Sequence, residues 1–171
     1  MKELAKSALQ ASKALRFDVS TFGSVPDVGL PAYSQQVLPR SLFSGTRGYI
    51  EKIVNQINGA YEKGWFDACA VMIRRLIETL IIECFEDHKI ADHIKSASGD
   101  FLYLGDLVQK FVDEPGWNVG RNTQRALRKL KNIGDQSAHS RRFTARRWDI
   151  DKVVDDLRVA AEELVYLARL K

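Results

Sequence analysis

Hydrophobic residues recur with helical spacing over most of the chain that follows Ser44. In residues 66–84, apolar side chains three and four positions apart form one continuous stripe, as one face of an amphipathic helix does. A similar stripe occupies residues 50–61, and Gly64 marks a break between the two. The sequence has no sustained alternation of apolar and polar residues, which is typical of a half-buried strand. The pattern predicts two long consecutive helices in an all-α fold.

Three further helices are expected towards the C-terminus. The first covers residues 102–111, because Pro115-Gly116 cannot continue a helix. A basic helix follows at about residues 122–133, and we interpret residues 134–139 as a turn. The last helix begins near Asp149, whose carboxylate can accept hydrogen bonds from the free N–H groups of a first helical turn. Together these elements predict a bundle of four to five helices.

The first 43 residues have a different character. Residues 1–15 predict a short helix, whereas the helical pattern stops in residues 17–43, where three of the four prolines lie. Because a long irregular segment is unusual inside a compact domain, we interpret it as an arm that packs on the bundle. The predicted organisation is an N-terminal helix and extended arm in residues 1–43 and a helical domain in residues 44–171.

The composition is that of an ordinary globular protein. The 171 residues are 45% hydrophobic and 28% charged, which fits one domain with a substantial core. The longest apolar run, residues 68–73, is far shorter than the roughly 18 residues of a membrane span. The N-terminus lacks the apolar segment of a signal peptide. We therefore expect a cytoplasmic protein without membrane contact.

The two cysteines are expected to be reduced. Cys69 and Cys84 fall on the same predicted helix, and their separation in sequence corresponds to about 22 Å along a helix axis. Bridged Cα atoms lie within about 7 Å of each other. Geometry therefore excludes a disulfide between them, and both are predicted to be buried thiols.

The net charge of +4 is unevenly distributed. Residues 121–147 contain nine lysines and arginines and a single acid, Asp135, which gives +8 for this segment (nine minus one) and −4 for the remainder of the chain. A concentrated basic patch favours an anionic partner, here RNA or DNA. The side chains expected to contact phosphates are Arg121, Arg125, Arg128, Lys129, Lys131, Arg141, Arg142 and Arg146.

Sequence motifs for cofactors and metals are absent. The chain has no phosphate-binding glycine-rich loop, dinucleotide fingerprint, paired CxxC or HExxH, so no cofactor is predicted. The spacing of Cys84, His88 and His93 matches no zinc motif, and a helix end followed by a polar loop explains it, so we expect no metal. Arg74 and Glu78 are four residues apart on the most apolar helix and are predicted to form a structural ion pair. Alternatively, an arginine of this helix reaches a buried carboxylate or the carbonyl groups of a helix end.

His139 is the side chain best suited to acid–base chemistry. A histidine can act as a general acid or base near neutral pH, and neighbouring cations can stabilise the transition state of RNA cleavage. The alternative is structural: His139 packs in, or caps, a turn between two helices, and the cations form a solvated surface.

A series of short motifs occurs between residue 38 and the C-terminus. They are Gly64-x-Phe66-x-Ala68, Arg74-x-x-x-Glu78, Leu127 to Lys131 and Gly134-Asp135-x-x-Ala138-His139, followed by a leucine-spaced C-terminal helix. In this order they resemble the HEPN superfamily (higher eukaryotes and prokaryotes nucleotide-binding), in particular the bacterial HEPN-like domain of unknown function often attached to restriction-endonuclease or helicase proteins. The resemblance implies a bundle of four to five helices that commonly dimerises, with the histidine-bearing junction near the two-fold axis. The apolar content of residues 64–85 and 150–170 also favours a homodimer.

The same resemblance bears on activity. Many HEPN proteins are metal-independent ribonucleases that use an Arg followed, after four to six residues, by a His, but the positions where that Arg would stand are Asn132, Ile133 and Gly134. We therefore favour a non-catalytic interaction module that binds nucleic acid, or a partner protein from a neighbouring gene, through residues 121–147. The alternative is an endoribonuclease of toxin or phage-defence type. In that case the site residues would be His139, Asn132 and Lys131, with Lys131 or Arg128 replacing the missing Arg.

Overall fold

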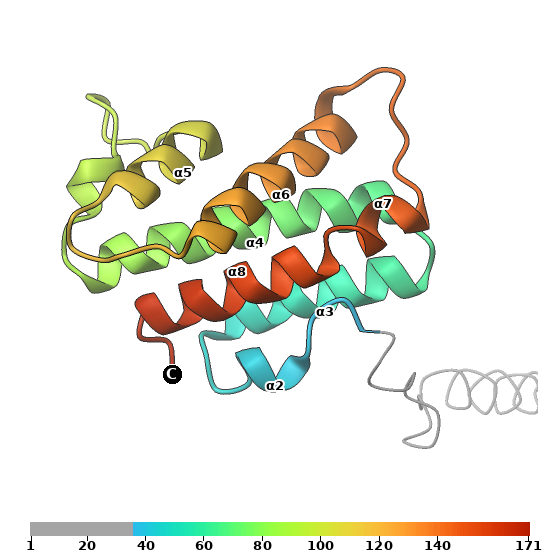
Figure 1. Cartoon of the computed structure of the whole chain (residues 1–171), viewed down its shortest axis with the longest axis horizontal. Helices are drawn as coiled ribbons and strands as arrows, with labels where there is room; N and C mark the ends of the chain where they lie inside the picture. Colours follow the sequence, from blue (N-terminus) through green and yellow to red (C-terminus); the bar gives the residue numbers. More distant parts are fainter. Residues whose placement is uncertain (1–35) are drawn as a thin grey trace, which may run out of the picture. The chain divides into compact units, whose positions relative to one another are not determined.

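The structure, a computed structural model, describes residues 36–171, which form a bundle of helices (Figure 1). Within this range no strand is present, and the one β-type pairing is a bridge between Lys95 and Phe101. The prediction of an all-α bundle is thus confirmed, whereas the helix predicted for residues 1–15 and most of the arm lie outside the described residues. None of the described helices is long and apolar enough to cross a lipid bilayer. The elements are α2 (Arg40–Phe43), α3 (Gly48–Glu62), α4 (Phe66–Asp87), the 3-10 helix η2 (Ala91–Ile94), α5 (Leu104–Asp113), α6 (Arg121–His139), α7 (Arg147–Asp151) and α8 (Val154–Leu167).

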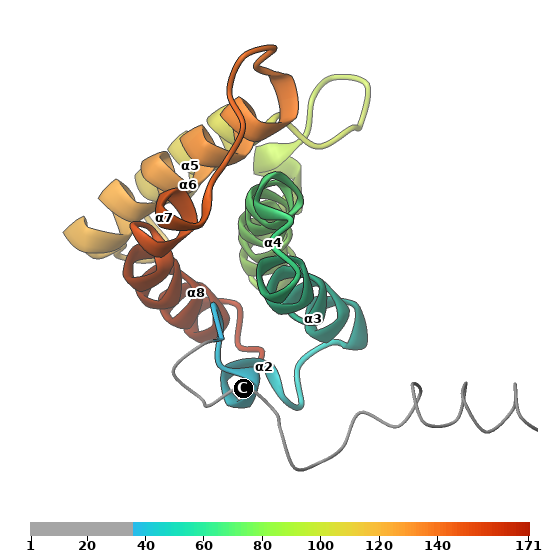
Figure 2. The same cartoon turned by 90° about the vertical axis from the view of Figure 1, so that its right-hand side faces the viewer.

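The core lies between two pairs of helices. One pair is α3 and α4, and the other is α6 and α8 (Figure 2). α4 packs against both members of the second pair as well as against α3, and α5 packs on α4 and α6 at one end of the bundle. The turn between α3 and α4 needs Gly64, because its φ of 74° lies in the left-handed region that favours glycine. α4 is therefore the central helix of the described bundle.

The predicted apolar faces form this core. Each fully buried aliphatic side chain stabilises the fold by roughly 1.5–3 kcal/mol. Because the faces of α4 and α8 are covered within a single chain, their apolar content does not require the homodimer that we predicted from it, and the dimer stays a prediction. The predicted stripe of α4 is buried except at its first residue, Phe66, which is partly buried against the core. The buried members are Cys69, Ala70, Ile73, Leu76, Ile77, Leu80, Ile81 and Cys84.

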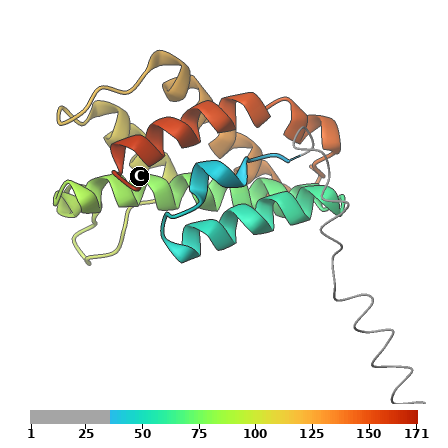
Figure 3. The same cartoon turned by 90° about the horizontal axis from the view of Figure 1, so that it is seen from below.

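Residues 37–43, which we assigned to the arm, belong to the compact unit that begins at Val37. Asn58 on α3 donates a hydrogen bond to the carbonyl oxygen of Leu38 (2.9 Å) and accepts one from its backbone N–H (3.0 Å). From the other side, Arg158 on α8 donates to the carbonyl oxygen of Val37 (3.0 Å). Leu38 is fully buried, so this segment closes the bundle between α3 and α8 (Figure 3).

The basic helix is longer than predicted. α6 runs from Arg121 to His139, so residues 134–139 are helical and the prediction of a turn there is wrong. Gly134 does not end the helix because it faces α4, where an added Cβ atom would lie 2.5 Å from the Cβ of Arg74. Gly134 therefore allows α6 and α4 to pack closely together, and it does not form a turn.

The last predicted helix is interrupted. α7 begins before Asp149, and Arg146 rather than Asp149 is its N-cap residue. The Asp149 carboxylate still supports the helix start, because it accepts a hydrogen bond from the N–H of Arg146 (3.0 Å) rather than from a first-turn N–H as predicted. Residues 152–153 form a turn that separates α7 from α8. Ile150 and Leu157, on either side of this break, are both buried in the same core. This shared burial explains why the apolar pattern is continuous although the helix is not.

An acidic side chain from α8 holds the start of α6. Glu163 accepts a hydrogen bond from the backbone N–H of Gly120 (2.7 Å) and another from the hydroxyl of the buried Thr123. A negative charge is favourable at this position, because the N-terminus of a helix presents free N–H groups and the positive end of its dipole. The contact fixes α6 against α8.

We predict that Gly134→Ala destabilises the fold although alanine is the better helix former. The added methyl group would overlap the base of the Arg74 side chain and push α4 and α6 apart. Overpacking of this kind costs about 1–3 kcal/mol of the free energy of unfolding. Urea unfolding followed by circular dichroism measures the change.

Gly59→Ala on α3 is the matched control. No atom lies within 4 Å of a Cβ atom built at Gly59, so this variant should gain up to about 1 kcal/mol from the helix propensity of alanine. Equal stability of the two variants would contradict the close contact between Gly134 and α4.

Candidate nucleic-acid interface

The outward face of α6 carries an arginine stripe, a name that we use for Arg121, Arg125 and Arg128, which are all exposed. At about 100° of rotation per residue they fall within a sector of about 60° of the helix circumference. His139, the last residue of the helix, falls in the same sector, about 27 Å along the axis from the first arginine. The single acid of α6, Asp135, is half-buried and points towards α4. The exposed stripe is therefore cationic throughout.

The other predicted phosphate contacts differ in how available they are. Lys129 pairs with Asp156 on α8 (2.7 Å), and its ammonium group is largely exposed. Exposed pairs of this kind are weak, so this lysine stays available to a phosphate. Lys131, by contrast, is held at 2.5 Å by Asp135. Within residues 36–171, no carboxylate pairs with the arginine stripe or with the arginines of the connection from α6 to α7, which are Arg141, Arg142 and Arg146.

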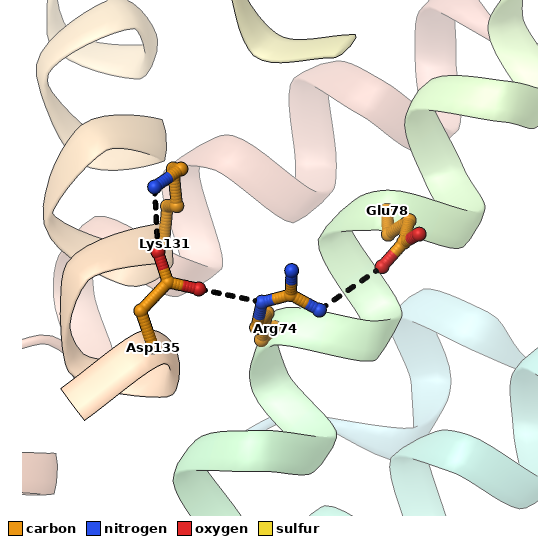
Figure 4. A network of polar contacts seen from close by, with 4 residues as sticks. All are labelled: Arg74, Glu78, Lys131 and Asp135. Carbon is orange, nitrogen blue, oxygen red and sulfur yellow. Dashed lines mark hydrogen bonds and ion pairs between the residues drawn. The ribbon is translucent and has the colours of Figure 1, made fainter. Parts of the chain in front are cut away.

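A network of ion pairs joins α6 to α4 (Figure 4). Arg74 on α4 donates through Nε to Asp135 (2.7 Å) and pairs through Nη1 with Glu78 (3.3 Å). Lys131 pairs with the second oxygen of Asp135. The predicted pair of Arg74 with Glu78 is confirmed. The alternative holds in part, because the same arginine also reaches a half-buried carboxylate on another helix.

This network sets the protonation of Asp135. Burial alone would raise the pKa of its carboxyl group, but the hydrogen bonds and charges of Lys131 and Arg74 outweigh burial, and the pKa lies below its usual value. The carboxylate is therefore ionised at neutral pH and binds two cations. Because Asp135 is paired with Arg74 and Lys131, no ion pair joins it to the arginine stripe.

The residues of the ribonuclease hypothesis are not assembled within one chain. Lys131 lies about 12 Å before His139 along the helix axis, and Asn132 about 10 Å before it. His139 is exposed and, in the described part of the chain, its side chain has no hydrogen bond or ion pair. It therefore lacks the oriented partner that a general base needs. Its exposure also does not fit a histidine that packs in a turn, whereas the cations around it are exposed, as the structural interpretation expected.

The three side chains that we considered as metal ligands bind to different partners. Cys84 lies in the core with its Sγ 3.5 Å from the carbonyl oxygen of Leu164. The Nδ1 of His88 lies 2.9 Å from the carbonyl oxygen of Cys84, and that of His93 lies 3.2 Å from the carboxylate of Glu114. Among the residues that the structure describes, no three His, Cys, Asp or Glu side chains are placed to share one metal ion.

Both cysteines are free and buried, as predicted. Burial raises the pKa of the Cys69 thiol to about 12. Burial is also the main cause that raises the pKa of Cys84, and the nearby carboxylate of Glu83 adds to it. The thiolate, which is the nucleophilic form of cysteine, is therefore scarcely populated at either position.

A groove that the sequence did not predict lies beside the arginine stripe. It has a volume of about 430 Å³ and is formed by α6, α7 and the residues around them. At its edge, the Nζ of Lys152 lies 3.7 Å from the ring centre of the exposed Trp148. The sequence feature that could have indicated this groove is the pair of amide side chains Asn132 and Gln136, which are four residues apart on the basic helix. The groove is lined by Lys129, Asn132, Ile133, Gln136, Phe143, Asp149, Lys152 and Val153.

Comparisons of the chain with protein-family models, with curated proteins and with solved structures give no match. The resemblance to the HEPN superfamily therefore stays a prediction that depends on the order of the sequence motifs. What the interface binds has to be inferred from its own chemistry.

We predict that Asp135→Ala lowers the free energy of unfolding by about 1–3 kcal/mol at neutral pH, because two half-buried cations lose a charge-assisted partner. The effect depends on pH. Since the pKa of Asp135 is lowered in the folded state, the stabilisation is complete above the unfolded-state value of about 4. It is lost as the pH falls through the folded-state pKa. Urea unfolding from neutral to acidic pH measures this dependence.

The matched control for Asp135 is Asp92→Ala. The Asp92 carboxylate is 93% exposed and pairs with Lys95 on the surface, so its removal should change stability by less than about 0.5 kcal/mol. Wild type should lose more stability than Asp135→Ala on acidification. The same loss in both proteins would contradict the role of the network.

We predict that His139→Ala changes the free energy of unfolding by less than about 0.5 kcal/mol, because the side chain is exposed and has no partner in the described residues. The activity test is therefore free of folding effects. Wild type and variant are incubated with long RNA in EDTA, and both are melted. We expect cleavage by neither. Cleavage by wild type that the variant loses, at an unchanged melting temperature, would favour the ribonuclease hypothesis.

Proposed function

We propose that this domain binds nucleic acid without cleaving it, through phosphate groups that meet the arginine stripe and the connection from α6 to α7. The observation that carries the proposal is the one-sided charge of α6. Its exposed face has three arginines without a carboxylate partner in the described residues, while its single acid, Asp135, is already paired with Arg74 of α4 and with Lys131. A surface of this kind attracts a polyanion, and binding is driven by the release of counterions.

The spacing of the cations suits a linear anion. Arg121, Arg125 and Arg128 follow one another at steps of about 6 and 4.5 Å along the helix axis. A guanidinium group can bind a phosphate through two parallel hydrogen bonds, and its long side chain can reach neighbouring phosphates. Arg141, Arg142 and Arg146 extend the cationic surface beyond the C-terminal end of the helix. Because phosphate contacts carry no base information, we expect binding to this surface to be independent of sequence.

A partner protein with an acidic surface would meet the same charges. We favour nucleic acid because the arginines are spaced for a linear run of phosphates, and because the exposed Trp148 beside the groove offers a ring on which a base can stack. The catalytic alternative has less support, because His139 has no oriented partner within one chain. We therefore favour nucleic-acid binding over RNA cleavage as the function of this surface.

We predict weak binding in which log K falls with log salt. If about five cations neutralise phosphates, the slope should be about −3.5 for single strands and about −4.5 for duplex DNA. The combined change Arg121→Glu, Arg125→Glu and Arg128→Glu should reduce binding below detection, because it replaces three attractions by three repulsions. Fluorescence anisotropy of labelled oligonucleotides at several salt concentrations measures both effects.

The matched control reverses three exposed lysines outside α6, as Lys52→Glu, Lys89→Glu and Lys110→Glu. It changes the net charge by the same amount and should retain most of the binding. Equal losses in the two triple variants would show that total charge matters rather than the arginine stripe. A wild-type protein that binds no nucleic acid at low salt would contradict the proposal and leave an acidic partner protein as the alternative.

A further inference from the structure

The groove beside the arginine stripe has an apolar floor and a polar wall. Ile133 and Val153 are each 8% exposed, and Phe143 is half-buried next to them. The exposed amides of Asn132 and Gln136 lie on α6 along the groove. The volume of about 430 Å³ falls within the range of about 300–1,000 Å³ that is usual for small-molecule sites. A flat ring system with a polar edge would match this lining.

The two amides are available to such a ring. Asn132 and Gln136 are four residues apart and are therefore neighbours on one face of α6. In the described part of the chain neither side-chain amide has a hydrogen-bond partner. Each amide offers a donor and an acceptor side by side, which is the pattern that pairs with the edge of a nucleobase, above all of adenine.

The charges around the groove suit the phosphates on either side of a base. Lys129, which is 59% exposed, is held only by a surface ion pair that can open. Lys152 lies over the ring of Trp148, whose exposed indole adds a surface on which a neighbouring base can stack. The single acid in the lining, Asp149, has one carboxylate oxygen occupied by the backbone N–H of Arg146 (3.0 Å).

We propose that this groove takes an unpaired base of a single-stranded nucleic acid, RNA or DNA, whose phosphates lie on the arginine stripe. The proposal depends on the function proposed above and names its substrate class. In a duplex the base edges are paired and the base faces are stacked, so a base must leave the stack before it can enter the groove. The domain should therefore bind single strands more tightly than duplexes.

The test compares a labelled single-stranded oligonucleotide of about 16 nucleotides, made as RNA and as DNA, with the corresponding duplexes. The full chain is used as wild type and as the double variant Asn132→Ala with Gln136→Ala. We expect the double variant to bind single strands about tenfold more weakly and duplexes as well as wild type does. Both positions are exposed on a helix, where alanine is the best helix former, so the variant should fold.

The matched control is Asn55→Ala with Gln56→Ala, which removes the same two amides from exposed positions of α3. It should bind every probe as wild type does. The groove proposal is overturned if the α6 amide variant binds single strands like wild type, or if wild type binds duplexes as tightly as single strands; the proposed function survives both results. A wild-type protein that binds no probe defeats both proposals. Binding of RNA alone or of DNA alone, with the same loss in the α6 variant, supports the groove and identifies the strand.

Discussion

The close contact between α4 and α6 at Gly134 is the constraint on which the described bundle depends. No side chain separates the two helices there, since even a methyl group would overlap the Cβ of Arg74. At this approach Arg74 meets Asp135 at 2.7 Å, and the surrounding ion pairs satisfy charged groups that are only partly solvated. Close packing and ion pairing therefore hold the two helices together at the same point. This contact lets α4 pack against α6 as well as against its own partner, α3.

The same arrangement determines the charge of the outer surface. Acids that contact α6 are used to hold it: Asp135 binds Arg74 and Lys131, and Asp156 on α8 binds Lys129. Glu163, also on α8, accepts hydrogen bonds at the start of the helix. None of these carboxylates pairs with the arginine stripe. The acids that hold α6 are thus matched by other groups, and the arginine stripe keeps its full positive charge.

The elements that the sequence predicted well are those in which local periodicity and burial agree, such as the stripe of α4. The predictions failed where a distant partner overrides a local preference. Gly134 and Asp135 are typical turn residues, and only the packing of Arg74 against them explains why α6 continues to His139. The break at residues 152–153 has no glycine or proline to signal it. At the candidate site, the basic residues could be read directly from the sequence. The groove could not, because it forms only where α7 folds against α6, and the spacing of residues along the chain does not predict that contact.

The burial of both cysteines has a practical consequence. The chain contains two cysteines, and both lie in the core of the described bundle. Their thiols are protonated at neutral pH and shielded from reagents, because maleimide and iodoacetamide attack through the thiolate form. A single cysteine introduced on the outer side of α6 would then be the one reactive thiol of the folded protein. A fluorophore attached there, paired with a dye at one end of a bound strand, would reveal the polarity with which the strand runs along the helix.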